Sequence, residues 1–160
     1  NIMSELEVRI VRLEPIRVAS FHAFSATPEH DAIRKLIAWA QPKGMLNGTA
    51  RQRIFGFNNP DPSPGSPNYG YEFWITVGPD VQPGEGLTIK EFPGGLYAVT
   101  RCEVKEPYKD IPGTWERLAT WCEDSKYRMA RHQWLEEHLA PYPIAVTEEF
   151  TLDLYLPIAE

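Results

Sequence analysis

Alternating apolar and polar residues predict several short β-strands in this chain. The clearest strand covers residues 69–77, and its two faces differ. One face carries Tyr71, Phe73, Ile75 and Val77, and the other carries Glu72, Trp74 and Thr76. Further strands are expected at 7–13, 17–24, 51–57, 87–92, 96–104 and 150–157. The first two should form a bent strand or a hairpin, and Pro93-Gly94-Gly95 should turn within a second hairpin.

Two other stretches place apolar residues at helical spacing. The first begins at Thr27-Pro28-Glu29, which offers a hydroxyl cap, a proline and an acid in the first turn, and it ends at Pro42. The second helix is marked by Pro112, Trp115, Leu118, Ala119 and Cys122. Residues 127–139 fit either a strand or a helix, and the proline-rich residues 58–68 predict an exposed loop.

The order strand, helix, strand, strand occurs twice along the chain. Residues 34–40 align with 116–122, and residues 71–75 align with 152–156 at nearly the same offset. One such unit cannot bury both its helix and its sheet face alone. The repeat therefore predicts one α+β domain over residues 6–158, with pseudo-repeats at about 6–79 and 86–158. The two units should form a pseudo-twofold antiparallel sheet with the helices packed on one face.

Composition and charge narrow the function. Of the 160 residues, 42% are hydrophobic and 12% aromatic, enough for a core and for an aromatic-lined pocket. The net charge of −6 argues against direct nucleic-acid binding by this chain. Cys102 and Cys122 suit a reducing cytoplasm, and no apolar run is long enough for a membrane span.

The chain offers few catalytic or metal-binding motifs. His132 and His138 are six residues apart with no acid or cysteine cluster at ligand spacing, so neither a metal nor a cofactor is expected. A Gly-x-Ser-x-Gly nucleophile motif and a phosphate-binding loop are both absent from the sequence.

An acid two residues from an aromatic ring occurs at the same place in both units. Glu72 precedes Trp74, and Asp153 precedes Tyr155, on the face away from the aliphatic side chains. Such a pair suits a flat organic cation, although Glu72 could equally be a solvated acid and the rings could be core residues. Trp115 has two interpretations as well, core packing or a wall of the binding site.

Four segments carry a resemblance to a known family: residues 69–77, 89–99, 134–139 and 152–158. They resemble the GyrI-like small-molecule-binding family, the effector-binding domain of AraC- and MerR-type multidrug regulators, which also occurs alone. The resemblance implies a duplicated fold and an aromatic-lined ligand cleft between the halves. It also implies a glutamate in a late strand that binds cationic drugs, and Leu135-Glu136 matches that signature. His138 departs from the aromatic residue common there, and a register shift of one would bring Glu137 into the cleft instead.

Three functions compete on this basis. The first is a module that binds amphipathic, cationic aromatic molecules through Glu136, Glu72, Trp74, Tyr155 and Trp115, and it is favoured over an enzyme. The second is a hydrolase of strained electrophilic drugs, with Glu136 as general base beside Tyr155 or Tyr97. The third is a protein-interaction module of the gyrase-inhibitor type. The sequence has no helix-turn-helix segment, so a transcriptional role requires a DNA-binding domain in cis or in trans.

Overall fold

The protein consists of two helices and one large antiparallel sheet. The computed structural model describes residues 6–47, 52–140 and 149–160. The helices are α1 (Pro28–Ala40) and α2 (Pro107–Glu123), with a short 3-10 turn at Gln41–Lys43. The strands are β1 (Arg9–Leu13), β2 (Ile16–Ser25), β3 (Ile54–Asn58), β4 (Tyr69–Thr76), β5 (Thr88–Phe92), β6 (Gly95–Val104), β7 (Arg128–Met129), β8 (Leu135–His138) and β9 (Phe150–Ala159). The ambiguous segment 127–139 thus forms strands, and residue 51 of the expected strand 51–57 lies outside the described residues.

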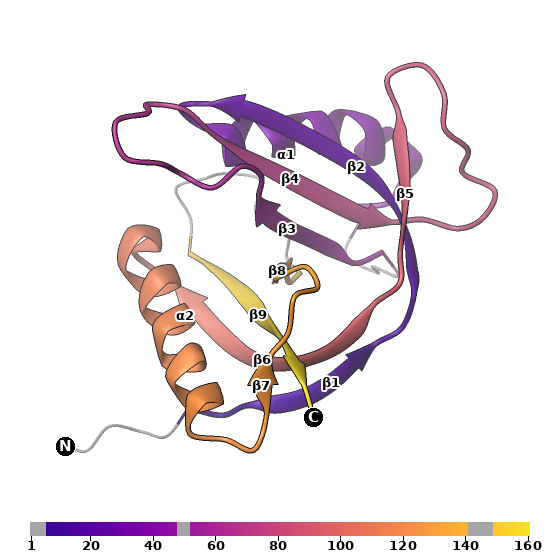
Figure 1. Cartoon of the computed structure of the whole chain (residues 1–160). Helices are drawn as coiled ribbons and strands as arrows, with labels where there is room; N and C mark the ends of the chain where they lie inside the picture. Colours follow the sequence, from indigo (N-terminus) through magenta and orange to yellow (C-terminus); the bar gives the residue numbers. More distant parts are fainter. Residues whose placement is uncertain (1–5, 48–51, 141–148) are drawn as a thin grey trace.

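The expected duplication is visible in the order of the elements. β2-α1-β3-β4 is followed by β6-α2-β8-β9, as Figure 1 shows. Equivalent helix positions are buried alike: Leu36 and Leu118 are both fully buried, as are Ala40 and Cys122. Both helices start with a proline in the first turn, where its missing N–H costs no hydrogen bond. Among the described residues, neither helix is long and apolar enough to cross a membrane.

Of the two alternatives for the first strands, the bent strand is observed, and the hairpin predicted around Pro93-Gly94-Gly95 is wrong. β1 pairs with β6 and β2 pairs with β5, so each bent strand crosses to the other unit. The pairing keeps one register across the bend, from Leu13 opposite Gly95 to Ile16 opposite Phe92. Gly94 makes this crossing possible, because its φ is +77° and a Cβ there would lie 1.9 Å from the Leu13 carbonyl oxygen.

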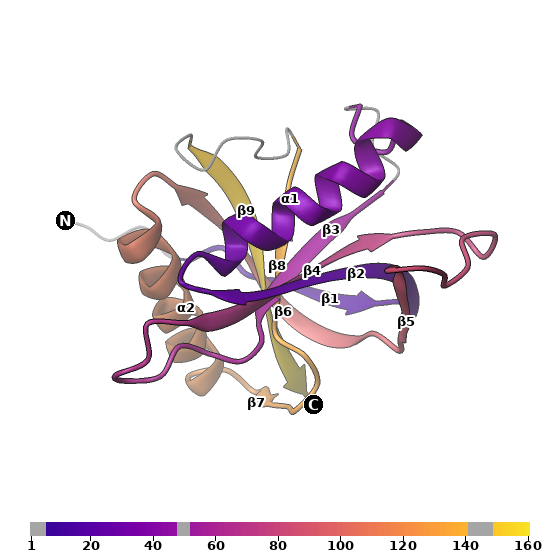
Figure 2. The same cartoon turned by 90° about the horizontal axis from the view of Figure 1, so that it is seen from above.

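The complete sheet runs in the order β1-β6-β9-β8-β3-β4-β2-β5, and the small strand β7 pairs with β9. β3 and β8 are the central neighbours, so the two units meet at this pair. The sheet is strongly curled, which Figures 1 and 2 show from two directions. Its two faces therefore have different surroundings.

One face is covered by both helices. α1 packs on β2 and β4 around Leu36, and α2 packs on β6 and β9 around Leu118. The opposite face lies inside the curl, where Phe55, Trp74, Tyr97 and Tyr155 belong to one buried cluster. The space between the two helices lies over the central strands β3 and β8.

Candidate functional site

Glu136 lies at the centre of the helix-covered face. It is the second residue of β8 and is paired with Gly56 of β3 and Leu154 of β9. Alternation along β8 directs Leu135 and Glu137 to the opposite face, where both are buried. The carboxylate between the helices is thus that of Glu136, and Glu137 lies on the other side of the sheet.

Two neutral donors hold the Glu136 carboxylate. The Tyr71 hydroxyl donates to Oε1 at 2.7 Å, and the Trp115 Nε1–H donates to Oε2 at 3.0 Å. Burial raises the pKa of Glu136, the two hydrogen bonds oppose this, and the negative charge of Glu29 adds to the increase. Within the described part of the chain, no lysine or arginine forms an ion pair with Glu136.

Gly56 makes room for the Tyr71 ring. A Cβ at position 56 would lie 2.3 Å from the Tyr71 hydroxyl oxygen and 2.5 Å from its ring. Any larger residue would therefore displace the phenol that donates to Glu136. The glycine is needed for this close approach rather than for an unusual backbone conformation.

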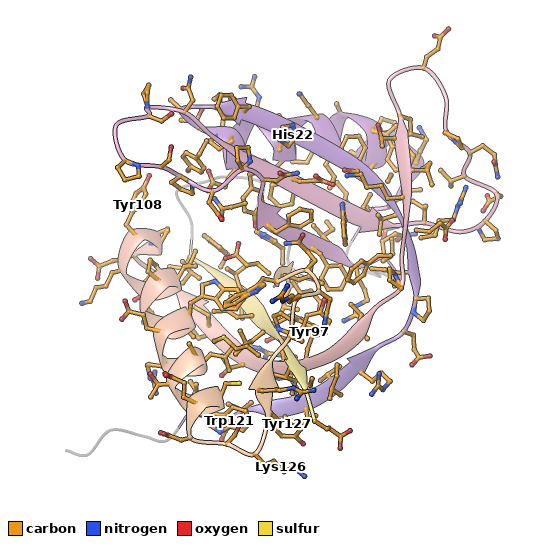
Figure 3. All side chains as sticks on the ribbon, in the orientation of Figure 1. His22, Tyr97, Tyr108, Trp121, Lys126 and Tyr127 are labelled. Carbon is orange, nitrogen blue, oxygen red and sulfur yellow. The ribbon has the colours of Figure 1, made fainter. Side chains whose placement is uncertain are left out.

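Two cavities meet at Glu136. The larger, about 500 Å³, is lined by Tyr71, Phe73, His138 and Phe150 of the sheet and by first-turn residues of both helices, including Glu29 and Tyr108. The smaller, about 450 Å³, is lined by Phe57, Asn58, Asp61, Trp115, Gln133 and Trp134. Glu136 belongs to the wall of both. Tyr108, in the first turn of α2, also lines the larger cavity and is 95% exposed; Figure 3 shows its side chain at that end of the helix.

His138 is a buried, uncharged neighbour of this site. Its Nε2 lies 3.2 Å from the Tyr71 hydroxyl, and its ring packs on Phe73 and Phe150. Burial lowers the pKa of His138 to about 3. Because Tyr71 donates its proton to Glu136, His138 Nε2–H is the donor to the phenol oxygen. The Nδ1 atom is buried without a hydrogen-bond partner among the described residues.

Of the five residues predicted for the ligand site, the structure brings two together. Trp115 of α2 contacts Glu136, so it forms a wall of the smaller cavity. Glu72, Trp74 and Tyr155 lie on the opposite face and line neither cavity. Their predicted contact with the same ligand has no geometric support here and stays a prediction.

The Glu72 carboxylate accepts hydrogen bonds from four side chains. It is 2% exposed and accepts hydrogen bonds from Lys90 Nζ, Ser20 Oγ and Trp74 Nε1, all on Oε2. Asn59 Nδ2 donates to its Oε1. Burial would raise the pKa of Glu72, but these hydrogen bonds outweigh burial and hold that pKa below its usual value.

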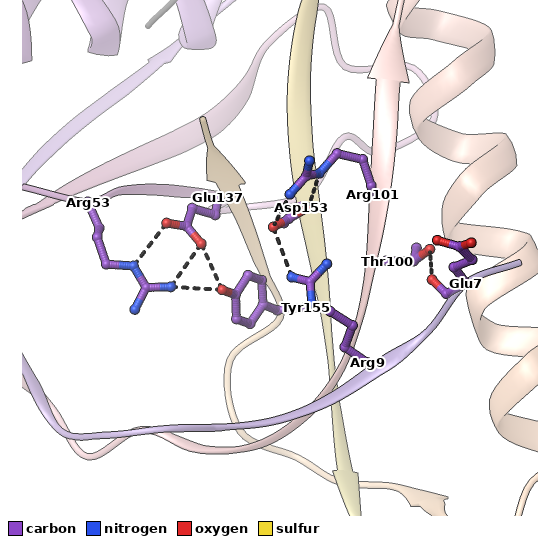
Figure 4. Close-up of polar contacts among 8 residues, drawn as sticks. All are labelled: Glu7, Arg9, Arg53, Thr100, Arg101, Glu137, Asp153 and Tyr155. Carbon is purple, nitrogen blue, oxygen red and sulfur yellow. Dashed lines mark hydrogen bonds and ion pairs between the residues drawn. The ribbon is translucent and has the colours of Figure 1, made fainter. Parts of the chain in front are cut away.

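Two further acids of that face are paired with arginines (Figure 4). Arg53 binds both oxygens of Glu137, each at 2.9 Å, and also donates to the Tyr155 hydroxyl at 2.8 Å. Asp153 is bound by Arg9 at 3.1 Å and by Arg101 at 2.8 Å. Tyr97 also lies inside the curl, where its hydroxyl donates to the Gln133 carbonyl oxygen. Tyr155 and Tyr97 therefore lie on the face opposite Glu136, and the phenol that contacts Glu136 is that of Tyr71.

Several residues that line the two cavities were missed by reasoning from the sequence, among them Tyr71, Phe73, Tyr108 and Trp134. Tyr71 and Phe73 were assigned to the aliphatic face of the strand at 69–77, and this face does pack in the core beneath α1. A polar phenol among aliphatic residues was the available signal, since a buried hydroxyl needs a partner. In the described residues, no group of His, Cys, Asp and Glu could hold a metal ion.

The chain is similar to a defined family over almost its whole length. The family described as "Integron-associated effector binding protein" (Cass2) matches residues 9–158. The chain belongs to this family. This membership confirms the GyrI-like resemblance found in the sequence. None of the curated proteins matches the chain significantly.

Solved structures of low sequence identity share the fold of this Cass2-family protein. The EcmrR C-terminal domain is 15% identical, with a TM-score of 0.66 over 97% of this chain and 98% of that one. The chain spans 57% of the EcmrR protein seen in a complex with DNA. A hydrolase from Listeria innocua is 12% identical, with a TM-score of 0.65 over 98% and 94% of the two chains. SAV2435 bound to tetraphenylphosphonium is 11% identical, with a TM-score of 0.53 over 96% and 94%.

Proposed function

We propose that this effector-binding domain, spanning residues 6–158, takes up amphipathic aromatic cations in the two cavities beside Glu136. One observation carries the proposal: among the described residues, only neutral groups donate to Glu136, whereas the buried acids of the opposite face are bound by lysine or arginine. A partly buried carboxylate without a countercharge favours a ligand that supplies one.

The cavity walls match such a ligand. Tyr71, Phe73, Trp115 and Trp134 present aromatic rings around the carboxylate, and rings attract cations through their negative faces. The cation loses water on entry, and Glu136 replaces part of that hydration. Support also comes from SAV2435, a protein of similar fold whose structure contains tetraphenylphosphonium, a lipophilic cation.

The proposal extends to the setting of the domain. EcmrR, which shares the fold, has been seen bound to DNA, so we propose a DNA-binding domain acting with this one in cis or in trans. A cytoplasmic location fits the two free, buried cysteines.

Calorimetry with a charged and a neutral ligand tests the role of Glu136. Tetraphenylphosphonium is the cation, and triphenylphosphine oxide is a neutral aromatic of related shape. We expect Glu136→Gln to weaken binding of the cation by about 1.5–3 kcal/mol, roughly tenfold to a hundredfold, because a charge-assisted contact is lost. The neutral compound should be affected much less.

Glu103→Gln, a change at an exposed position of β6, is the matched control and should leave both affinities unchanged. Equal losses for the charged and neutral ligands in Glu136→Gln would contradict the proposal.

A hydrolase is the second candidate, because burial makes Glu136 a stronger base and a cavity gives water access to it. A water oxygen would attack the carbon of a strained ring while Glu136 takes its proton. The ring C–C bond would break, and the proton would pass to the leaving carbon. Incubation with a cyclopropane-bearing electrophile should then give a ring-opened product that Glu136→Gln does not form. A gyrase-type protein interaction stays a prediction.

A further inference from the structure

The most informative feature of the site is that one carboxylate serves two separate cavities. Tyr71, which donates to Oε1, lines the larger cavity, and Trp115, which donates to Oε2, lines the smaller one. The two donors to Glu136 therefore come from the linings of two different cavities. A compact cation would occupy only one of them.

The smaller cavity has the parts of a binding site in its own right. Trp115 and Trp134 lie with their ring centroids 5.1 Å apart at a tilt of 47°, and Phe57 forms a further aromatic wall. Trp134 remains 39% exposed although it is a large aromatic side chain. An exposed ring beside a hollow of about 450 Å³ offers a stacking surface for a flat group.

Negative charge is present at both ends of the site. Glu29 lines the larger cavity, Asp61 lines the smaller one, and Glu136 lies between them. Glu29 is near enough for its charge to raise the pKa of Glu136. Among the described lining residues of the two cavities there is no lysine or arginine. A single positive charge would leave at least one end without a countercharge.

We propose that the domain binds elongated organic dications, with one positively charged aromatic group in each cavity and the spacer passing over Glu136. This inference rests on the proposed function, since it assigns the class of ligand to the same site. The larger cavity takes one head group against Tyr71 and Phe73. The smaller cavity takes the other head group against Trp134.

Joining two head groups should give a large gain in affinity, because the second group binds at a high effective concentration once the first is in place. The probes are bis-quinolinium compounds joined by alkyl spacers of increasing length. Each is compared with a single quinolinium carrying the same alkyl chain, which controls for the added apolar surface. We expect one dication per chain, an optimum in spacer length and a gain of about a hundredfold over the single head group.

Two variants locate the second head group. Trp134→Ala should reduce the affinity for the best dication about tenfold, because stacking in the smaller cavity is lost. The single quinolinium should lose clearly less, because it can still bind in the larger cavity. Trp121→Ala is the matched control, since Trp121 stacks on Tyr127 at the other end of α2 (Figure 3). Asp61→Asn should weaken only the dication, by about two- to fivefold, and the exposed Asp80→Asn should not.

The results separate this inference from the proposed function. If the single quinolinium binds and depends on Glu136, but no dication binds more tightly, the dication proposal is overturned and the proposed function stands. A dication gain that survives Trp134→Ala would overturn the placement in the smaller cavity. If neither probe binds, both proposals are overturned.

Discussion

Glu136 and Glu137 are neighbours on β8, yet they have opposite surroundings. Glu137 faces the inside of the curl, where Arg53 binds both of its oxygens and Tyr155 donates a third hydrogen bond. Glu136 faces the helices, where the neutral groups of Tyr71 and Trp115 are its hydrogen-bond donors among the residues that the structure describes. The first arrangement satisfies a buried charge within the fold, and the second leaves the charge available to a ligand. The missing countercharge, rather than burial alone, is what distinguishes Glu136 from its neighbour and supports the proposed binding site.

Removing the countercharge on the paired side should have the largest effect. We expect Arg53→Met to lower the free energy of unfolding by about 3 kcal/mol, because Glu137 would be left buried with its charge unpaired. Urea denaturation at neutral pH measures this. The double variant Arg53→Met/Glu137→Leu should recover much of the loss. A loss of under about 0.5 kcal/mol in Arg53→Met would show that this ion pair contributes no more than a solvent-exposed one.

His138 should make the helix-covered face sensitive to acid. Its pKa is about 3 in the folded protein, against about 6.5 when unfolded. The unfolded state therefore takes up the proton first, so this histidine lowers stability as the pH falls from 6.5 towards 3. Relative to His138→Gln, the wild-type protein should lose about 2 kcal/mol of stability between pH 7 and pH 5. Thermal or urea unfolding across this range provides the measurement, and parallel curves for the two proteins would refute the expectation.

Gly56→Ala tests how tightly Tyr71 is held over the central strands. The new Cβ would overlap the phenol, so we expect a loss of about 1–3 kcal/mol in stability and weaker binding of the cation. In a Tyr71→Leu background the same substitution should cost clearly less, because the ring that it meets is gone. A double-mutant cycle reports this coupling, and strictly additive losses would argue against it.

Glu136→Gln should have the smallest effect on stability, in contrast to its effect on ligand affinity. Since the carboxylate has no cation to lose, we expect a change of less than about 0.5 kcal/mol, or a slight gain. The pKa of Glu136 is raised in the folded protein, so the unfolded state ionises first as the pH rises. The wild-type protein therefore loses stability between the unfolded and the folded pKa, and Glu136→Gln does not show this loss. Unfolding curves of the unliganded proteins at pH 4 and pH 7 measure the difference. A marked loss of stability in Glu136→Gln at pH 7 would show that the carboxylate is paired with a cation in the folded protein.

Local patterns were sufficient for most elements and for the central residue. The alternation at 69–77, the Pro28 helix start and the match of Leu36 with Leu118 all correspond to observed features. The family signature at Leu135-Glu136 located the acid that the structure places between the helices. Long-range pairing was the part that failed, because Pro93-Gly94-Gly95 has the composition of a hairpin turn while its strands pair elsewhere.

The predicted group of site residues is divided between the two faces of the sheet for a related reason. Glu72, Trp74 and Tyr155 were predicted to line a binding surface because they lie opposite the aliphatic face, although the rings could also be core residues. The curl of the sheet gives that second face a core of its own. Curvature of this kind depends on how distant strands pair, and no local pattern in the sequence reports it.

The crossing of β1–β2 with β5–β6 has a consequence for how the chain acquires its structure during synthesis. β1 pairs with β6, and β3 pairs with β8, so strands from the early part of the chain need partners made much later. The last strand, β9, is flanked by β6 and β8 and completes the sheet. Contacts between residues so distant in sequence slow folding, because a long loop must close before they form. The sheet therefore stays incomplete on the ribosome until β9 has emerged, and the two cavities beside Glu136 are complete only then.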